Sequence, residues 1–216
     1  MKTVLGKQVF DMVEEMIAPA HTAVLLIDMQ NDFVHADGAS GKCGQNVSLV
    51  RAIVPAIRRL IDGARAHGVC VVHVQNTTLP DGSSDSPAWL WFKTQYGKDP
   101  AYCMPGTWGH RMVDELPALP GEPHVQKYRS SGFTHTNLDH VLRNRGIKTV
   151  ICCGCTTDGC VESTVRDASF HDYYTLVASD AVASLTPANH EASLMVMRSR
   201  YPVHEVNRYL EIWAKR

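Results

Sequence analysis

Short apolar runs alternate with amphipathic segments along most of the chain, and this alternation narrows the choice of fold more than any other feature. Residues 22–27, 69–74, 149–153 and 173–178 are mainly apolar runs typical of buried parallel strands. Segments with apolar residues at helical spacing separate them, as at 48–67. The same alternation continues with strands at 124–126 and 203–206 and helices at 86–96, 137–145, 161–171, 187–199 and 207–215. We therefore predict a three-layer α/β/α sandwich with a mainly parallel sheet and helices on both faces.

Length and charge favour one domain that acts on a small molecule. The 216 residues contain no repeat or linker, so we expect a single domain over residues 1–216, with residues 1–20 as an N-terminal extension that carries a helix at 8–17. A net charge of −1 argues against nucleic acid or a membrane surface as partner. The chain starts without the apolar core of a signal peptide, and no apolar stretch is long enough to span a bilayer. We expect a cytoplasmic protein with a small-molecule partner.

Three polar residues follow strands at the same edge of the predicted sheet. Asp28 ends the first strand, Lys127 follows the strand at 124–126, and Cys160 lies one turn after the strand at 149–153. Ligands of open parallel sheets bind beyond the carboxyl ends of the strands, so we expect these side chains to lie together. Cys160 also opens a helix, whose dipole and free N–H groups favour the reactive thiolate.

A carboxylate, an ammonium group and a thiol in one place can perform hydrolysis. Asp28 can take the thiol proton of Cys160, and Lys127 can stabilise the thiolate and orient Asp28. Each residue alone has a simpler interpretation: a small buried thiol, a carboxylate that caps a turn, and a solvated lysine. The combination favours catalysis over these structural roles.

Three stretches of the chain resemble the isochorismatase-like cysteine hydrolases. They are Leu25 to Phe33, Gln126 to Phe133, and Cys153 to Thr164 with its continuation to Ala168. Together they fall within residues 22 to 183, in the family's order and spacing. The resemblance implies the isochorismatase-like form of the α/β/α fold.

The resemblance also implies a site. It makes Asp28, Lys127 and Cys160 a catalytic triad and places a cis peptide bond between Cys155 and Thr156. The backbone N–H groups of Thr156 and Cys160 would then form an oxyanion hole. The implied reaction is acyl transfer through a thioester on Cys160, with release of ammonia or an amine and with no metal or other cofactor.

Within this family, the C–N hydrolases fit better than the other branches. True isochorismatases cleave a vinyl ether and typically lack the cysteine that stands here as Cys160. Nicotinamidases carry an Asp-x-His metal motif after the second strand, where this chain has His73 to Thr78 without such a motif.

The ureidoacrylate amidohydrolases and the biuret, triuret and N-carbamoyl amide hydrolases resemble this chain more closely, for example at Gln75-Asn76. Tyr128-Arg129-Ser130 differs from the Pro-Arg-Tyr of the ureidoacrylate enzymes, so the substrate stays open among linear amides and ureides. Isochorismatase-type and nicotinamidase-type activities are the enzymatic alternatives.

Four residues are candidates for contact with the substrate. Phe33 is expected to form a wall of the pocket, Asn76 to contact the substrate or Asp28, and Gln30 to bind substrate beside them. Arg129 is proposed, on residue type alone and with Arg166 as the alternative, to hold a substrate carboxylate.

The long segment 76–121 is expected to be functional, because irregular segments of this length in compact domains usually are. Its aromatic residues would close the pocket or form a contact between subunits, and the resemblance implies a homodimer or homotetramer. These aromatic residues are Trp89, Trp91, Phe92 and Trp108.

A non-enzymatic interpretation rests on the cysteines. Four of the 7 cysteines lie between 152 and 160, so a redox-sensing or metal-sensing protein on the same fold is the alternative. A zinc site built from Cys153, Cys155 and Cys160 lacks the Cys-x-x-Cys spacing of structural zinc sites. We therefore assign Cys152, Cys153 and Cys155 to packing and expect no metal site.

Overall fold

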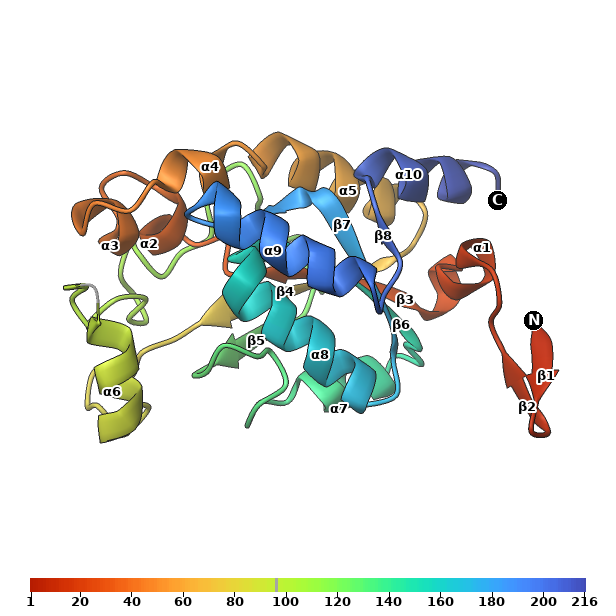
Figure 1. Ribbon diagram of the computed structural model, residues 1–216, viewed down its shortest axis with the longest axis horizontal. Helices are drawn as coiled ribbons and strands as arrows, with labels where there is room; N and C mark the ends of the chain where they lie inside the picture. Colours follow the sequence, from red (N-terminus) through yellow and green to blue (C-terminus); the bar gives the residue numbers. More distant parts are fainter. Residues whose placement is uncertain (96) are drawn as a thin grey trace.

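In the computed structural model, which describes residues 1–95 and 97–216, the main sheet is parallel and has the strand order β5-β4-β3-β6-β7-β8 (Figure 1). Every pair of neighbouring strands in it runs in the same direction. The strands are β3 (Thr22–Ile27), β4 (Cys70–Asn76), β5 (His124–Lys127), β6 (Thr149–Cys155), β7 (Tyr174–Ala183) and β8 (Val203–His204). This confirms the predicted parallel sheet.

Helices cover both faces of the sheet, because side chains alternate between the faces along each strand. Val24 and Leu26 of β3 pack into the apolar layer under one set of helices. Ala23, Leu25 and Ile27 pack into the layer under the other set. The first set is α4 (Val47–Arg51), α5 (Val54–Ala66) and α10 (Val206–Ala214), and the second is α7 (Leu138–Arg143), α8 (Glu162–Phe170) and α9 (Pro187–Arg198) (Figure 1). The predicted three layers are confirmed.

The N-terminal residues differ from the expected helix at 8–17. Residues 2–9 form an antiparallel hairpin, β1 (Lys2–Val4) and β2 (Lys7–Val9), which projects from the end of the molecule (Figure 1). Leu5 and Gly6 between the strands both have positive φ, which is typical of a tight hairpin turn. The predicted helix is therefore wrong over its first half, and only α1 (Val13–Met16), followed by the 3₁₀ turn η1 (Pro19–His21), remains of it.

Smaller differences concern segments near the carboxyl edge of the sheet. The segment that follows β3, where no helix was predicted, forms α2 (Asn31–Val34) and α3 (Ala39–Lys42). The helix expected at 48–67 divides into α4 and α5, with a proline in the first turn of α5. The helix expected at 86–96 is α6 (Pro87–Thr94), and Tyr96 lies outside the described residues.

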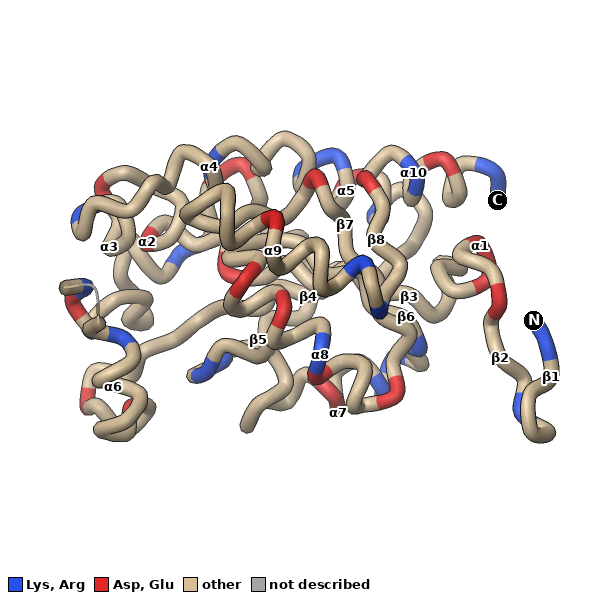
Figure 2. Tube along the Cα trace, in the orientation of Figure 1, with Lys and Arg blue, Asp and Glu red and all other residues tan. Residues whose placement is uncertain are grey.

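Figure 2 shows acidic and basic residues interspersed over the outer helices, in keeping with the net charge of −1. Within the described part of the chain, no helix combines the length and the apolar character needed to cross a membrane.

Candidate active site

The structure brings Asp28, Lys127 and Cys160 together at the carboxyl edge of the sheet. Lys127 Nζ lies 2.7 Å from Asp28 Oδ2 and donates a 3.2 Å hydrogen bond to Cys160 Sγ. Asp28 and Lys127 are buried, whereas Cys160 is half-buried. Three side chains that are distant in the sequence therefore share one charged cluster with a partly accessible thiol.

The strand order explains how the lysine reaches the aspartate. β5 is separated from β3 by β4, and Lys127 is in register with Asn76 of β4. The Lys127 side chain crosses this strand to Asp28, and its Nζ also donates to the Arg129 carbonyl at 3.1 Å. The backbone N–H of Asn76 donates to Asp28 Oδ1 at 2.9 Å. The carboxylate is therefore fixed from two sides, at the edge of the cavity.

Cys160 lies in a tight turn between β6 and α8. The turn η2 (Thr157–Val161) has π-helical geometry and leads directly into α8. The Cys155–Thr156 peptide bond before it is cis, as the family resemblance implied. The Cys155 thiol donates to the Asp28 carbonyl at 3.2 Å, so this turn is tied to the end of β3.

Gly154 lets the two central strands approach closely at this point. Its φ is +117°, and a Cβ atom there would lie 2.0 Å from the carbonyl oxygen of Ile27. A side chain at this position would therefore push the Cys160 turn away from Asp28.

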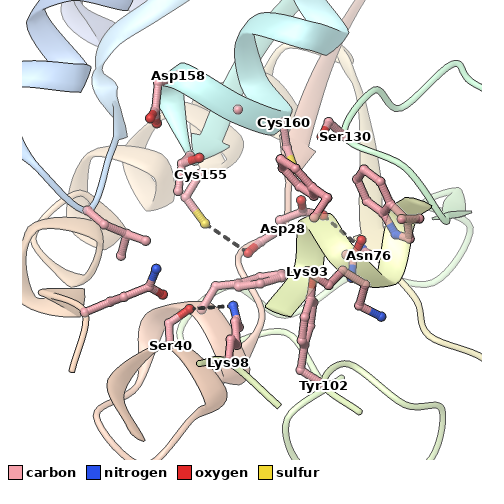
Figure 3. Close-up of a pocket in the computed structure, with 17 residues that line it drawn as sticks. Asp28, Ser40, Asn76, Lys93, Lys98, Tyr102, Ser130, Cys155, Asp158 and Cys160 are labelled. Carbon is pink, nitrogen blue, oxygen red and sulfur yellow. Dashed lines mark hydrogen bonds between the residues drawn. The ribbon is translucent and has the colours of Figure 1, made fainter. Parts of the chain in front are cut away.

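A cavity of about 380 Å³ borders Cys160 (Figure 3). Such a volume suits a small molecule. Phe33 and Asn76, two of the predicted substrate contacts, line it, and so do Thr156 and Cys160, whose amides were predicted as the oxyanion hole. Of the aromatic residues in segment 76–121, the cavity is lined by Trp89, Phe92 and Tyr102.

Two other predicted contacts have different positions. Gln30 is fully buried, and its amide group donates to the carbonyls of Asn76 at 2.9 Å and His110 at 2.8 Å. Gln30 therefore supports Asn76 and does not line the cavity. The Arg129 guanidinium donates to the Ser84 carbonyl at 2.8 Å and lies 5.0 Å from the centre of the Trp89 ring.

Arg129 is not among the residues that line the cavity, and its guanidinium contacts the Trp89 ring. Arg166, the alternative, pairs with Glu162 on its own helix at 2.6 Å. Neither arginine lines this cavity, and their role in binding a substrate carboxylate stays a prediction. The cavity has other polar and apolar lining residues that were not singled out from the sequence: Ser40, Gln45, Lys93, Lys98, Tyr102, Ser130, Asp158 and Leu185.

The electrostatics of Cys160 differ from the sequence prediction. The helix start was expected to favour the thiolate, but burial, together with the negative charge of Asp28, raises the pKa of Cys160 to about 12 even though Lys127 opposes this. Burial alone would lower the pKa of Lys127, but the charges of Asp28 and Cys160 raise it overall. In the site without substrate, burial and Asp28 outweigh the helix start and favour a neutral thiol beside a charged lysine, which agrees with the predicted role of Asp28 as the base.

This arrangement predicts an unusual thiol titration. Because the pKa of Cys160 is raised to about 12, we expect it to lose its proton only in strongly alkaline solution. The ultraviolet absorbance of thiolate, measured as the difference between the wild type and Cys160→Ser, should appear only as the pH approaches that value. A difference signal near neutral pH would mean that the thiolate is already present at rest.

The zinc alternative has no geometric basis in the structure. The thiol of Cys153 donates to the Leu25 carbonyl at 3.4 Å, and that of Cys155 donates to the Asp28 carbonyl. Over residues 1–95 and 97–216, no three His, Cys, Asp or Glu side chains are grouped so that they could hold a metal ion.

Comparison with known proteins places this site in a family. Residues 22–206 match the isochorismatase domain. The chain is 36% identical over 181 residues to the ureidoacrylate amidohydrolase RutB of Agrobacterium fabrum, and the aligned region covers 79% of each protein. A RutB from Rhizobium rhizogenes is 35% identical over 181 residues, covering 79% of this chain and 74% of the relative.

Solved structures are similar as well. A cysteine hydrolase from Pseudomonas syringae is 26% identical with a TM-score of 0.81, over 93% of this chain and 95% of the other. The N-carbamoylsarcosine amidase of Thermoplasma acidophilum is 28% identical with a TM-score of 0.69, over 86% of this chain and 96% of the other.

Proposed function

The chain belongs to the isochorismatase family, and we propose that it is a cysteine-dependent amidohydrolase that cleaves a C–N bond of a small linear ureide or amide. The observation that carries the proposal is the Lys127 ammonium group, 2.7 Å from Asp28 and 3.2 Å from the Cys160 sulfur, beside a cavity of small-molecule size. The printed names of two relatives, a ureidoacrylate amidohydrolase and an N-carbamoylsarcosine amidase, support a ureido or carbamoyl group as the group attacked.

In the proposed reaction, the substrate binds while the Cys160 thiol is still protonated and neutral. The proton of Cys160 moves to the Asp28 carboxylate as the sulfur attacks the carbonyl carbon. Lys127 stabilises the sulfur's developing negative charge, and the N–H groups of Thr156 and Cys160 bind the oxyanion. Because the pKa of the thiol is raised at rest, proton transfer and attack are coupled, and the nearby base is essential.

The second half of the reaction restores the enzyme. When the tetrahedral intermediate collapses, the C–N bond breaks and Asp28 returns its proton to the leaving nitrogen, which departs as ammonia or an amine. A thioester remains on Cys160. Asp28 then takes a proton from water, whose oxygen attacks the thioester carbonyl, and the released sulfur regains a proton from Asp28. The net change is the addition of one water molecule across the C–N bond.

An assay of ammonia release tests the proposal directly. The purified protein is incubated with linear ureides, N-carbamoyl amino acids and aliphatic amides, and with a vinyl ether and nicotinamide as controls for the other branches. We expect ammonia from at least one linear ureide or amide. We also expect a transient mass increase on the peptide that contains Cys160, seen by rapid-quench mass spectrometry. Turnover of the vinyl ether without cleavage of any C–N bond would overturn the proposal.

A further inference from the structure

A second lysine lies on the opposite side of the cavity from Cys160 (Figure 3). Lys98 Nζ donates to Ser40 Oγ at 2.9 Å and lies 4.6 Å from the centre of the Phe33 ring and 4.2 Å from that of Tyr102. Within the described residues, no carboxylate pairs with this ammonium group. Its charge is therefore held between two aromatic faces and a hydroxyl group, at the cavity wall.

The other lysines at the site already have anionic partners. Lys93 Nζ lies 3.2 Å from Asp85 and donates to Thr78 Oγ1 at 2.9 Å. Lys127 is paired with Asp28. Lys98 differs from both, because no carboxylate lies within ion-pair distance of its Nζ atom in the part of the chain that the structure describes.

The charge of the nearby Asp32 raises the pKa of Lys98, but in the described residues this carboxylate forms no ion pair with Lys98. Its carboxylate accepts backbone N–H groups from Ala39 at 3.0 Å and Cys103 at 2.7 Å. Asp158, which also lines the cavity, bonds to Ser184 and Asn189. Figure 3 shows Asp158 on the far side from Lys98.

Two neutral groups that line the same cavity as Lys98 have unused hydrogen-bonding capacity. Ser40 is buried and accepts the bond from Lys98, so its own O–H remains as a donor. Gln45 lines the same cavity, and its Oε1 atom is buried without a hydrogen-bond partner in the described residues. Rotation of the Gln45 amide group would present its N–H₂ at this position instead. In that orientation the unpaired N–H₂ could be completed by a ligand that accepts a hydrogen bond, such as a carboxylate.

We propose that Lys98, Ser40 and Gln45 form a carboxylate-binding subsite, so that the substrate is an acidic ureide or amide bound with its carboxylate here and its scissile carbonyl at Cys160. The proposal rests on the hydrolytic function proposed above and names the substrate class for it. The three groups offer an ammonium, a hydroxyl and an amide donor to one anion. Phe33 and Tyr102 flank the chain that joins the two ends of the substrate.

The charge state of Lys98 is consistent with this role. Burial lowers the pKa of Lys98 from its usual value, and a bound carboxylate would raise it again by its opposite charge. The charged form of Lys98 is therefore unfavourable while the subsite is empty, and the negative charge of an acidic substrate stabilises it. A neutral ureide of the same length gains nothing from Lys98.

Matched substrates and variants test the subsite. N-carbamoyl-β-alanine carries the carboxylate, and N-propylurea is a neutral analogue of similar length. We expect Lys98→Gln to raise KM for N-carbamoyl-β-alanine by about 10- to 100-fold, the loss of one charge-assisted hydrogen bond. The variant should change kcat/KM for N-propylurea by less than about 3-fold, and Lys98→Arg should retain most of the preference for the acid. Lys42→Gln, which removes an exposed charge at the end of α3, is the matched control and should behave as the wild type.

The outcomes separate this inference from the proposed function. If Lys98→Gln weakens both substrates equally, or neither, the carboxylate subsite is wrong while hydrolysis stands. If the wild type releases ammonia from no ureide or amide, hydrolysis is wrong. Calorimetric binding of N-carbamoyl-β-alanine and N-propylurea then decides the subsite by itself. Tighter binding of the acid that disappears in Lys98→Gln supports the subsite, and equal binding of the two compounds overturns it.

Discussion

Serine in place of Cys160 is expected to slow the release of ammonia by on the order of 10⁴-fold or more, with almost no loss of stability. The hydroxyl group is a far weaker acid than the thiol, so Asp28 cannot generate the nucleophile at a useful rate. The substitution keeps the size of the side chain, and the Oγ atom can still accept the hydrogen bond that Lys127 now donates to sulfur. Ammonia release and thermal unfolding of the two proteins measure the two parts of this prediction.

Cys70→Ser provides the matched control. Cys70 is a half-buried thiol that begins β4, at the end of the strand opposite Asn76 and the active site. We expect this variant to retain turnover within about 2-fold of the wild type, since changes distant from the reacting groups usually leave them undisturbed. Wild-type turnover in Cys160→Ser would contradict the assignment of the nucleophile. Equal losses in both variants would show a general effect of thiol removal instead.

The sequence was sufficient to predict the sheet and the meeting of three polar side chains. All six residues of β3 are buried, as a continuous apolar run predicts for a central parallel strand. Side chains that follow the strands of one parallel sheet must lie at one edge, so the proximity of Asp28, Lys127 and Cys160 follows from topology. The N-terminal hairpin was missed because its three-residue strands show too little alternation to be separated from a helix.

The pKa of Cys160 and the residues that line the cavity depend on the folded structure, so they could not be predicted from the sequence in the same way. The helix start is a local feature and favours the Cys160 thiolate. The burial and the charge of Asp28 that raise the pKa of the thiol exist only in the folded protein. Lys98 comes from the irregular segment 76–121, for which only the length indicated a function, and Ser40 comes from the short helix α3, which was not predicted. Arg129 was chosen by residue type, which says nothing of the Ser84 carbonyl that holds it.

Removal of the buried cation is expected to have the largest effect on stability. Lys127→Met should lower the free energy of unfolding by about 3–5 kcal/mol, because it leaves the Asp28 carboxylate buried without its partner. Turnover should fall with it, since nothing then stabilises the negative charge on sulfur. Urea denaturation and ammonia release measure the two effects.

The stabilising effect of Lys127 should also depend on pH. Because pairing raises the pKa of Lys127, its contribution to the free energy of unfolding is complete below the usual lysine pKa of about 10.4 and declines at higher pH. The stability difference between the wild type and the variant should therefore shrink in strongly alkaline buffer.

The double variant Asp28→Asn/Lys127→Met separates folding from chemistry. It removes both charges, so we expect it to recover much of the stability lost in Lys127→Met, as replacement of a buried ion pair by neutral groups often does. Activity should not recover with it, because the base and the cation are both absent. The Asn76 N–H can still donate to the amide oxygen that replaces Asp28 Oδ1, which keeps the end of β3 in place. If turnover returned together with stability, the pair would be structural and some other group would be the base. If Lys127→Met alone were as stable as the wild type, the two charges would not be coupled in the way that the 2.7 Å contact requires.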